Sequence, residues 1–168
     1  MVLSLGTAIV GILQLVIAII LAVVALYIGF SVLGKITKGI DEEKEIAKGN
    51  TAVGILVASV FIAIGIVVQS GVSGISVGIL QAMKVGILSG GGIAILLVSI
   101  LQLVLGIVLA IAAIYLALNV LDRLTKGIDE FAELKKGNVA VALEMAGVII
   151  TVAIIIQSGV MGITAALI

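Results

Sequence analysis

The sequence has no cysteine, histidine, proline or tryptophan, and charged residues occupy only 11% of its 168 positions. Without cysteine and histidine, the chain can form no disulfide and lacks the thiol and imidazole groups that bind zinc or haem. Without proline, no helix contains a proline kink. Soluble domains contain about 25% charged residues, so this composition indicates a membrane protein.

What the chain has instead is hydrophobic residues, at 63% of all positions. They form uncharged stretches at about 5–33, 51–72, 93–121 and 139–163, each long enough to cross a bilayer, since about 20 residues suffice. A chain in lipid must satisfy its own backbone hydrogen bonds, so we expect helices. The sequence predicts an all-α membrane protein with four transmembrane helices and the lipid bilayer as its partner. A net charge of zero argues against nucleic acid.

The chain repeats itself at an offset of 88 residues. LQLV at Leu13–Val16 recurs at Leu101–Val104, and TKGIDE at Thr37–Glu42 recurs at Thr125–Glu130. Without gaps, roughly 35 of 80 aligned positions are identical, and polar strings in register indicate an internal duplication. Each copy contains two helices joined by a polar loop.

These boundaries divide the chain into repeat one at 1–80, a glycine-rich connector at 81–92 and repeat two at 93–168. The polar loops lie at 35–50 and 122–138. Eight of the nine lysines and arginines fall in these loops, and cations in short loops favour the cytoplasm. We therefore predict two parallel repeats in the plasma (inner) membrane, with cytoplasmic loops and both termini outside.

The segment at 69–92 is apolar but contains seven glycines and Lys84. If it crossed the bilayer, the chain would have five helices and inverted repeats, as many transporters do. The loops would then lie on opposite sides, and the positive bias would vanish. We favour a re-entrant or surface connector.

Polar residues at the loop ends predict helix caps. Asp41 and Asp129 can each start a short helix within the loop. Asn50 and Asn138 then stand where the following membrane helix needs an N-cap.

Small residues recur at equivalent positions and predict helix packing, because they allow close approach of backbones in lipid. The first helices carry Ala18, Ala22, Ala25 and Gly29, matched by Gly106, Ala110, Ala113 and Ala117; the second helices carry Gly54, Ala58 and Gly65, matched by Ala142, Ala146 and Ala153. The second helices have a further face of Ala140, Glu144, Gly147 and Thr151, matched by Ala52, Leu56, Ser59 and Ala63. Packing within the chain and self-association into a homo-oligomer are both open.

Four polar residues outside the loops are candidates for an ion pathway: Gln14, Gln102, Glu144 and Lys84. The two glutamines can instead form hydrogen bonds between helices. Glu144 lies about 9 Å into its helix, at 1.5 Å per residue from Asn138, and a carboxylate at that depth suggests a function. It can also pair with Lys84, stay neutral or reach the interface.

Acidic clusters of the form D-E-x-x-E, at Asp41–Glu45 and Asp129–Glu133, could hold a divalent cation. We favour solvated helix starts, and expect neither a metal nor a cofactor. No nucleophile–base pair or cofactor motif is present, so we do not expect an enzyme.

The passages TKGIDEEKEIAKGNTAVGILVAS and TKGIDEFAELKKGNVAVALEMAG resemble the YjfL-like integral membrane family, also described as domain of unknown function family 350. The matching residues are Thr37, Gly49, Asn50 and Ala52 in repeat one, and Thr125, Gly137, Asn138, Ala140 and Ala142 in repeat two. Gly54 replaces an expected alanine, and Lys38 and Lys126 replace the family's proline. The resemblance implies a multipass inner or plasma membrane protein linked to membrane-stress systems, and it supplies no catalytic residues.

Two functions follow as hypotheses. In the first, a self-associating membrane protein passes a small ion through a pathway containing Gln14, Gln102 and Glu144. In the second, a scaffold packs its helices and recruits a cytoplasmic protein partner through its loops.

Overall fold

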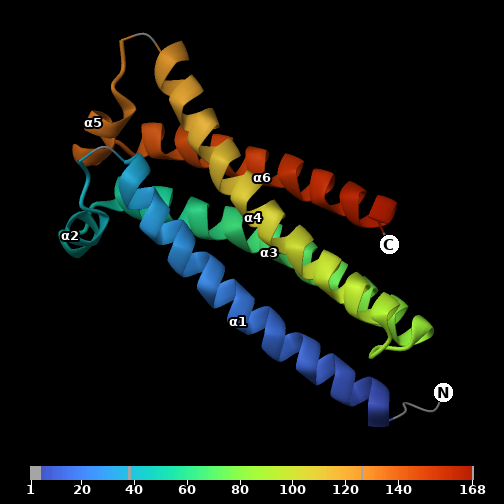
Figure 1. Cartoon of the computed structure of the whole chain (residues 1–168). Coiled ribbons are helices and arrows are strands. Elements are labelled where there is room, and N and C mark those ends of the chain that lie inside the picture. The colour runs from blue at the N-terminus through green and yellow to red at the C-terminus, as the bar shows by residue number, and fades with distance from the viewer. Residues whose placement is uncertain (1–4, 38, 126, 168) are drawn as a thin grey trace.

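The computed structural model describes residues 5–37, 39–125 and 127–167, and within these ranges the chain forms helices and no strands (Figure 1). The four long helices are α1 (Leu5–Ile36), α3 (Thr51–Val85), α4 (Gly90–Leu124) and α6 (Val139–Leu167). Two short helices, α2 (Glu42–Ala47) and α5 (Glu130–Lys135), lie in the polar loops. This confirms the predicted all-α architecture of paired repeats.

Each long helix contains a stretch long and apolar enough to cross a membrane: Leu15–Lys35, Thr51–Val85, Gly90–Arg123 and Val139–Ile163. The chain is thus a multipass membrane protein. The α3 stretch of 35 residues is about 50 Å long at 1.5 Å per residue. The hydrocarbon core of a bilayer measures about 30 Å, so α3 crosses it with a tilt or extends beyond it.

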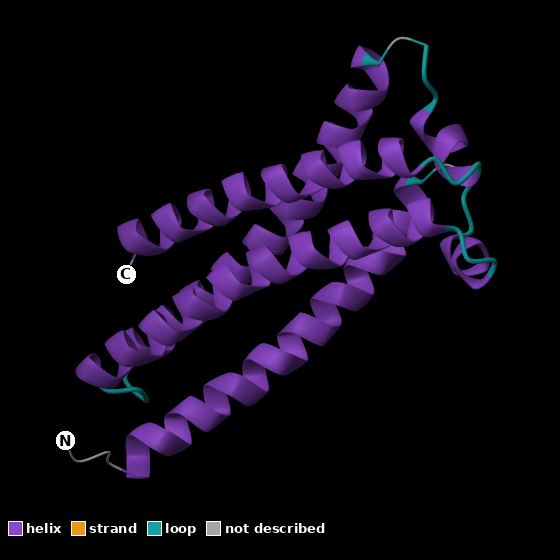
Figure 2. Ribbon diagram, turned by 180° about the vertical axis from the view of Figure 1, so that it is seen from behind, coloured by secondary structure: helices purple, strands orange, loops and turns teal. Residues whose placement is uncertain are grey.

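The centre of the bundle is α3, which packs against α6, α4 and α1. In an apolar 18-residue stretch of α3, 56% of residues are buried, against 11% in the corresponding stretch of α1. The other helices pack around α3 while α1 lies at one side of the bundle (Figure 2). The core is therefore built mainly from α3, α4 and α6.

The segment at 69–92 is mostly helical, and the second long helix does not end near residue 72 as expected. Helix α3 continues to Val85 and α4 begins at Gly90, so only a four-residue turn separates them. Two of its glycines, Gly71 and Gly78, lie at the contact between these two helices. A Cβ atom at Gly71 would come within 2.1 Å of Leu103, and one at Gly78 within 2.0 Å of Ser99. Glycine occupies these helical positions because α4 packs so closely that it leaves no space for a side chain.

The two loop helices, α2 and α5, lie at one end of the bundle (Figure 1). The turn between α3 and α4, the first residues of α1 and the last residues of α6 lie at the other end (Figure 2). Four long helices with both loops at one end form two parallel hairpins. The alternative with a fifth crossing at 69–92 is not formed.

Small residues of the two stripes lie at helix contacts in both hairpins, although the contacting positions are not equivalent in the repeat. In repeat one, a Cβ at Gly29 of α1 would lie 1.9 Å from Ile64 of α3. In repeat two, a Cβ at Gly106 of α4 would lie 3.0 Å from Val160 of α6. Ala25 and Ala110 of the same stripes are buried. Small residues on the first helix of each hairpin therefore let the second helix approach closely.

Candidate functional site

The polar end of the bundle is built from two short helices of the same design. Asp41 caps α2, because its carboxylate accepts a hydrogen bond from the Lys44 amide at 3.1 Å. Asp129 caps α5 by accepting from the Ala132 amide at 2.9 Å. Beyond the end of each helix, Gly49 and Gly137 adopt a φ of 82°, a left-handed conformation that glycine adopts without steric cost. The sequence predicts these starts and ends.

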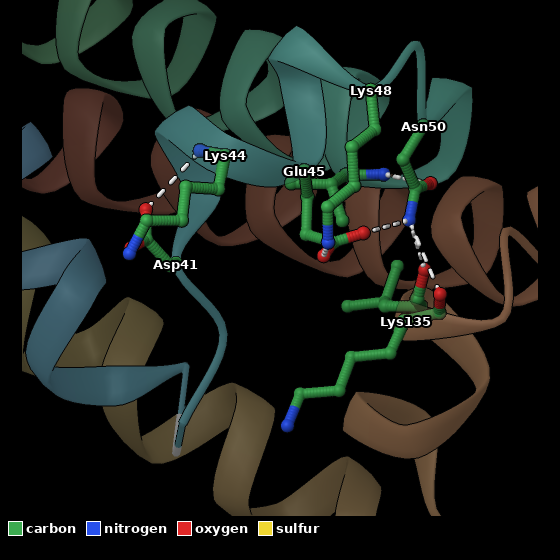
Figure 3. Close-up of polar contacts among 8 residues, drawn as sticks. Asp41, Lys44, Glu45, Lys48, Asn50 and Lys135 are labelled. Carbon is green, nitrogen blue, oxygen red and sulfur yellow. Dashed lines mark hydrogen bonds and ion pairs between the residues drawn. The ribbon is translucent and has the colours of Figure 1, made fainter.

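An asparagine follows each short helix and caps the next membrane helix. The Asn50 carboxamide oxygen accepts from the Val53 amide at 3.2 Å, and that of Asn138 accepts from the Ala140 amide at 3.1 Å. Their Nδ2 groups differ. Asn50 donates across the repeat boundary to the Leu134 carbonyl at 3.0 Å (Figure 3), whereas the described bonds of Asn138 stay within repeat two. Asn50 therefore joins the two loops.

Ion pairs stabilise the charged forms of two partly buried carboxylates, Glu45 and Glu133. Lys48 approaches Glu45 at 2.7 Å, and the bonds from Lys48 and then Asn50 lower the pKa of Glu45. In repeat two, the amide of Asn138 and then the ammonium of Lys136 lower the pKa of Glu133. These carboxylates are engaged with neighbouring donors in the charged form.

A second pair of contacts ties each short helix to the preceding long helix. The Thr37 hydroxyl contacts the carboxylate of Glu42 and donates to the Leu33 carbonyl at 2.9 Å. In repeat two, the Thr125 hydroxyl likewise contacts Glu130, and it donates to the Leu121 carbonyl at 2.8 Å. We call these two contacts the Thr–Glu pairs. Neither pair was predicted from the sequence, although a threonine five residues before a glutamate occurs in both copies of TKGIDE.

Around the Thr–Glu pairs, the two repeats differ in charge. Gly34 in repeat one corresponds to Asp122 in repeat two, and a Cβ at Gly34 would lie 3.5 Å from the carboxylate of Glu42. Leu56 corresponds to Glu144. Repeat two therefore has two carboxyl groups at positions where repeat one has none.

The structure does not bring the candidate pathway residues together. Glu144 is exposed in the second turn of α6, near the loop end. Lys84 is exposed in the last turn of α3, near the opposite end, so the two do not pair within one chain. Gln102 is 5% exposed, and its amide donates to the Val160 carbonyl at 3.1 Å. The side chain of Gln14, like Lys38 and Lys126 in the loops, lies outside what the structure describes.

The acidic clusters contain no preformed metal site in the part of the chain that the structure describes. In repeat one, Asp41 pairs with Lys44 and Glu45 with Lys48, while Glu42 turns inward to Thr37. The members of each cluster thus have separate protein partners.

Four apolar helices in two parallel hairpins define the class as a helical membrane protein with an internal repeat. The profile of the family named Domain of Unknown Function (DUF350) matches residues 6–107 and again residues 95–168. These two matches cover most of the chain, which therefore belongs to this family, as its motifs predict. No curated protein and no solved structure matches the chain.

Proposed function

We propose that this protein is a non-enzymatic membrane protein that assembles head to tail with copies of itself and passes a small ion. Its loops face the cytoplasm in this proposal, because they hold eight of the nine cations. The observation that carries the proposal is a carboxylate, Glu144, on an exposed helix face within a membrane span.

The same face is buried in repeat one and exposed in repeat two. We call the exposed set the open face of α6; it consists of Ala140, Glu144, Gly147 and Thr151. Its counterparts on α3 are buried in the bundle: Ala52, Leu56, Ser59 and Ala63. Helices α3 and α6 are copies of one sequence. Because this face is buried by protein on α3, we infer that the open face of α6 is also covered by protein.

The opposite asymmetry holds for the other small-residue face. On α6, Ala142, Ala146 and Ala153 are buried, whereas on α3 the counterparts Ala58 and Gly65 are exposed. We call Gly54, Ala58 and Gly65 the open face of α3. One chain therefore buries one small face of each helix and leaves the other small face of each helix uncovered.

A second copy can cover both open faces by repeating the contact that α3 and α6 make within the chain. The open face of α6 would then pack on the open face of α3 in the next copy. Such a contact joins two different surfaces, and heterologous contacts of this kind close into rings when the rotation allows. Ring closure would place Glu144 between protein chains instead of in lipid, where a carboxylate costs about 3 kcal/mol.

The assembly test uses blocked faces. At Gly147 and at Gly65, no atom lies within 4 Å of an added Cβ, so Gly147→Leu and Gly65→Leu leave the single chain intact. We expect each variant alone to lose assembly. A mixture of the two should form pairs, because each variant keeps the open face that the other has lost. Ala112→Leu, on the exposed side of α4, is the control and should assemble as the wild type does. If Gly65→Leu assembles normally, the head-to-tail contact is rejected.

Ion passage is tested by flux in liposomes. We expect the wild type to carry protons or potassium ions, and Glu144→Gln to lose most of this flux while assembling normally. Glu43→Gln, in the exposed part of α2, serves as the matched control. Flux that is unchanged in Glu144→Gln removes this carboxyl from the pathway, whereas Gln14 and Gln102 stay predictions for the same assay.

A scaffold is the second candidate, because the two loops form one joined polar surface. The bond from Asn50 to Leu134 connects α2 to α5, and Lys44, Lys48 and Lys136 are exposed on them. Capture of a cytoplasmic partner that depends on the loops, in a protein without flux, would favour this role. Cysteines placed at Glu43 and Lys135 should both react only after cell lysis if the loops are cytoplasmic.

A further inference from the structure

Glu130 is the most buried carboxyl group at the polar end of the bundle. It is 1% exposed, and its Oε2 atom has no hydrogen-bond partner among the described residues. The other oxygen contacts the Thr125 hydroxyl, which also donates to the Leu121 carbonyl. A hydroxyl has one proton to donate, so Thr125 cannot fully serve both acceptors. A buried carboxylate with so few donors is unfavourable in its charged form.

Asp122 approaches this carboxyl from the end of α4. The distance of 3.5 Å from a Cβ at Gly34 to Glu42 in repeat one shows that a side chain at this position faces the glutamate. In repeat two that side chain is Asp122, and it also borders an open cavity of about 250 Å³. The remaining lining residues are Asp129, Phe131, Ala132 and Lys135. Asp122 thus neighbours Glu130 and also borders an open cavity.

The charged groups that face Glu130 from neighbouring elements are carboxyls. They are Asp122 on α4 and Glu144 on α6, while α3 has Lys84 as its only charged residue, in its last turn. On α5 itself, Glu133 pairs with Lys136. Lys135 extends toward repeat one, because its Nζ lies 3.7 Å from the position that a Cβ atom at Gly39 would take. Arg123 on α4 and Lys35 on α1 are exposed, and among the described residues Glu130 makes no ion pair with a cation.

We propose that Asp122 and Glu130 form a proton-binding site in which the two carboxyl groups share one proton. Two carboxylates can only accept hydrogen bonds, so they repel each other when both are charged. One proton converts the contact into a charge-assisted O–H···O bond and supplies the missing donor for Oε2. The cavity beside Asp122 gives this proton access from the aqueous side.

The electrostatics of Glu130 support the site. Burial first, and then the carboxyls of Asp122 and Glu144, raise the pKa of Glu130, while the bond from its own backbone amide offsets part of the rise. Repeat one provides an internal comparison, because Glu42 makes the same contact with threonine but faces Gly34. The proton site is thus specific to repeat two, and it does not depend on the assembly or ion passage proposed above.

The test is infrared spectroscopy of the full chain in lipid nanodiscs, which detects the carbonyl stretch of protonated carboxyl groups. At about pH 6.5, an ordinary glutamate is only about 1% protonated. We expect the wild type to retain the band of one carboxyl group per chain at this pH. Glu130→Gln and Asp122→Asn should each lose that band, whereas Glu42→Gln and Glu144→Gln should keep it.

A gain-of-site variant keeps the proposal testable if the loss variants fold poorly. Gly34→Asp recreates the pair in repeat one, where the space for a Cβ is adequate, and it should add a second band of similar size. The site is overturned if the wild type shows no band at about pH 6.5, or if the band survives both Glu130→Gln and Asp122→Asn. A band lost in only one of these two variants overturns the shared proton. Flux plays no part in this readout, so failure here is distinct from failure of ion passage.

Discussion

The two repeats share one polar scaffold but use it differently. Both have an aspartate cap, a Thr–Glu pair and an asparagine cap. Repeat two adds Asp122 and Glu144 where repeat one has Gly34 and Leu56. Leu56 lies in the core at 0% exposure, whereas Glu144 lies on an uncovered face. After a duplication, a copy whose surface is open can acquire charge that the enclosed copy cannot tolerate.

Exchanging the residue types of Leu56 and Glu144 should give the largest effect on stability. Leu56→Glu puts a carboxyl into the closed core, and we expect a loss of stability of about 3 kcal/mol or more. Glu144→Leu should leave the stability of the single chain nearly unchanged, because the site is open. Thermal unfolding of the two purified variants measures the difference, and equal losses would show that the faces are equivalent.

Removing the asparagine caps should give a smaller, unequal loss. Asn50→Ala removes a cap and the bond to the Leu134 carbonyl, so we expect a loss of about 2 kcal/mol. Asn138→Ala removes a cap without a described contact across the repeats and should cost about 1 kcal/mol. Unfolding in denaturant under identical lipid or detergent conditions compares them. Equal losses would mean that the cross-repeat bond adds nothing.

The pH dependence of stability should separate the two buried glutamates. The pKa of Glu130 is raised from 4.5 in the folded chain, so its protonated form stabilises the fold fully below about pH 4.5. That contribution is lost as the pH rises through the folded pKa. Relative to the wild type, Glu130→Gln should remove this decline, and Glu42→Gln should leave it in place. Melting curves at several pH values test this, and identical slopes in all three proteins contradict it.

The smallest effect is expected at an exposed ion pair. Lys44 contacts Asp41 at 2.6 Å with most of its side chain in solvent, and it holds the pKa of Asp41 below the usual value. Repeat two has Ala132 at this position and still caps its short helix. Lys44→Ala should therefore leave the melting temperature unchanged, because exposed pairs contribute little. A clear drop would show that the two loops depend on charge to different degrees.

Much of the fold could be predicted because composition and periodicity determine it. The apolar stretches, the offset of 88 residues and the polar caps predicted four helices, two repeats and the short loop helices. The second helix was expected to end near residue 72 but continues to Val85. The glycines at 71 and 78 suggested a connector. They instead pack against Leu103 and Ser99 of α4, which are distant in the sequence. Sequence pattern alone does not distinguish glycine in a turn from glycine at a helix contact.

The candidate site was harder to predict than the fold. Polar residues in apolar helices pointed to Gln102 and Glu144, and the structure places one in a bond between helices and the other on an open face. The pairing of Asp122 with Glu130 depends on how the chain turns between α4 and α5. In the sequence, both residues resemble solvated loop charges. The burial of Glu130 beside Asp122 follows from tertiary packing that no local pattern encodes.

The position of α3 between the two halves has a consequence for biosynthesis. Its inward side, which includes Ser59, is covered only when α4 and α6 are present. We therefore expect the first hairpin to complete its packing only after α4 and α6 have been synthesised. Two hairpins translated as separate polypeptides would face the same delay without a tether, which gives the fused gene an advantage in assembly yield.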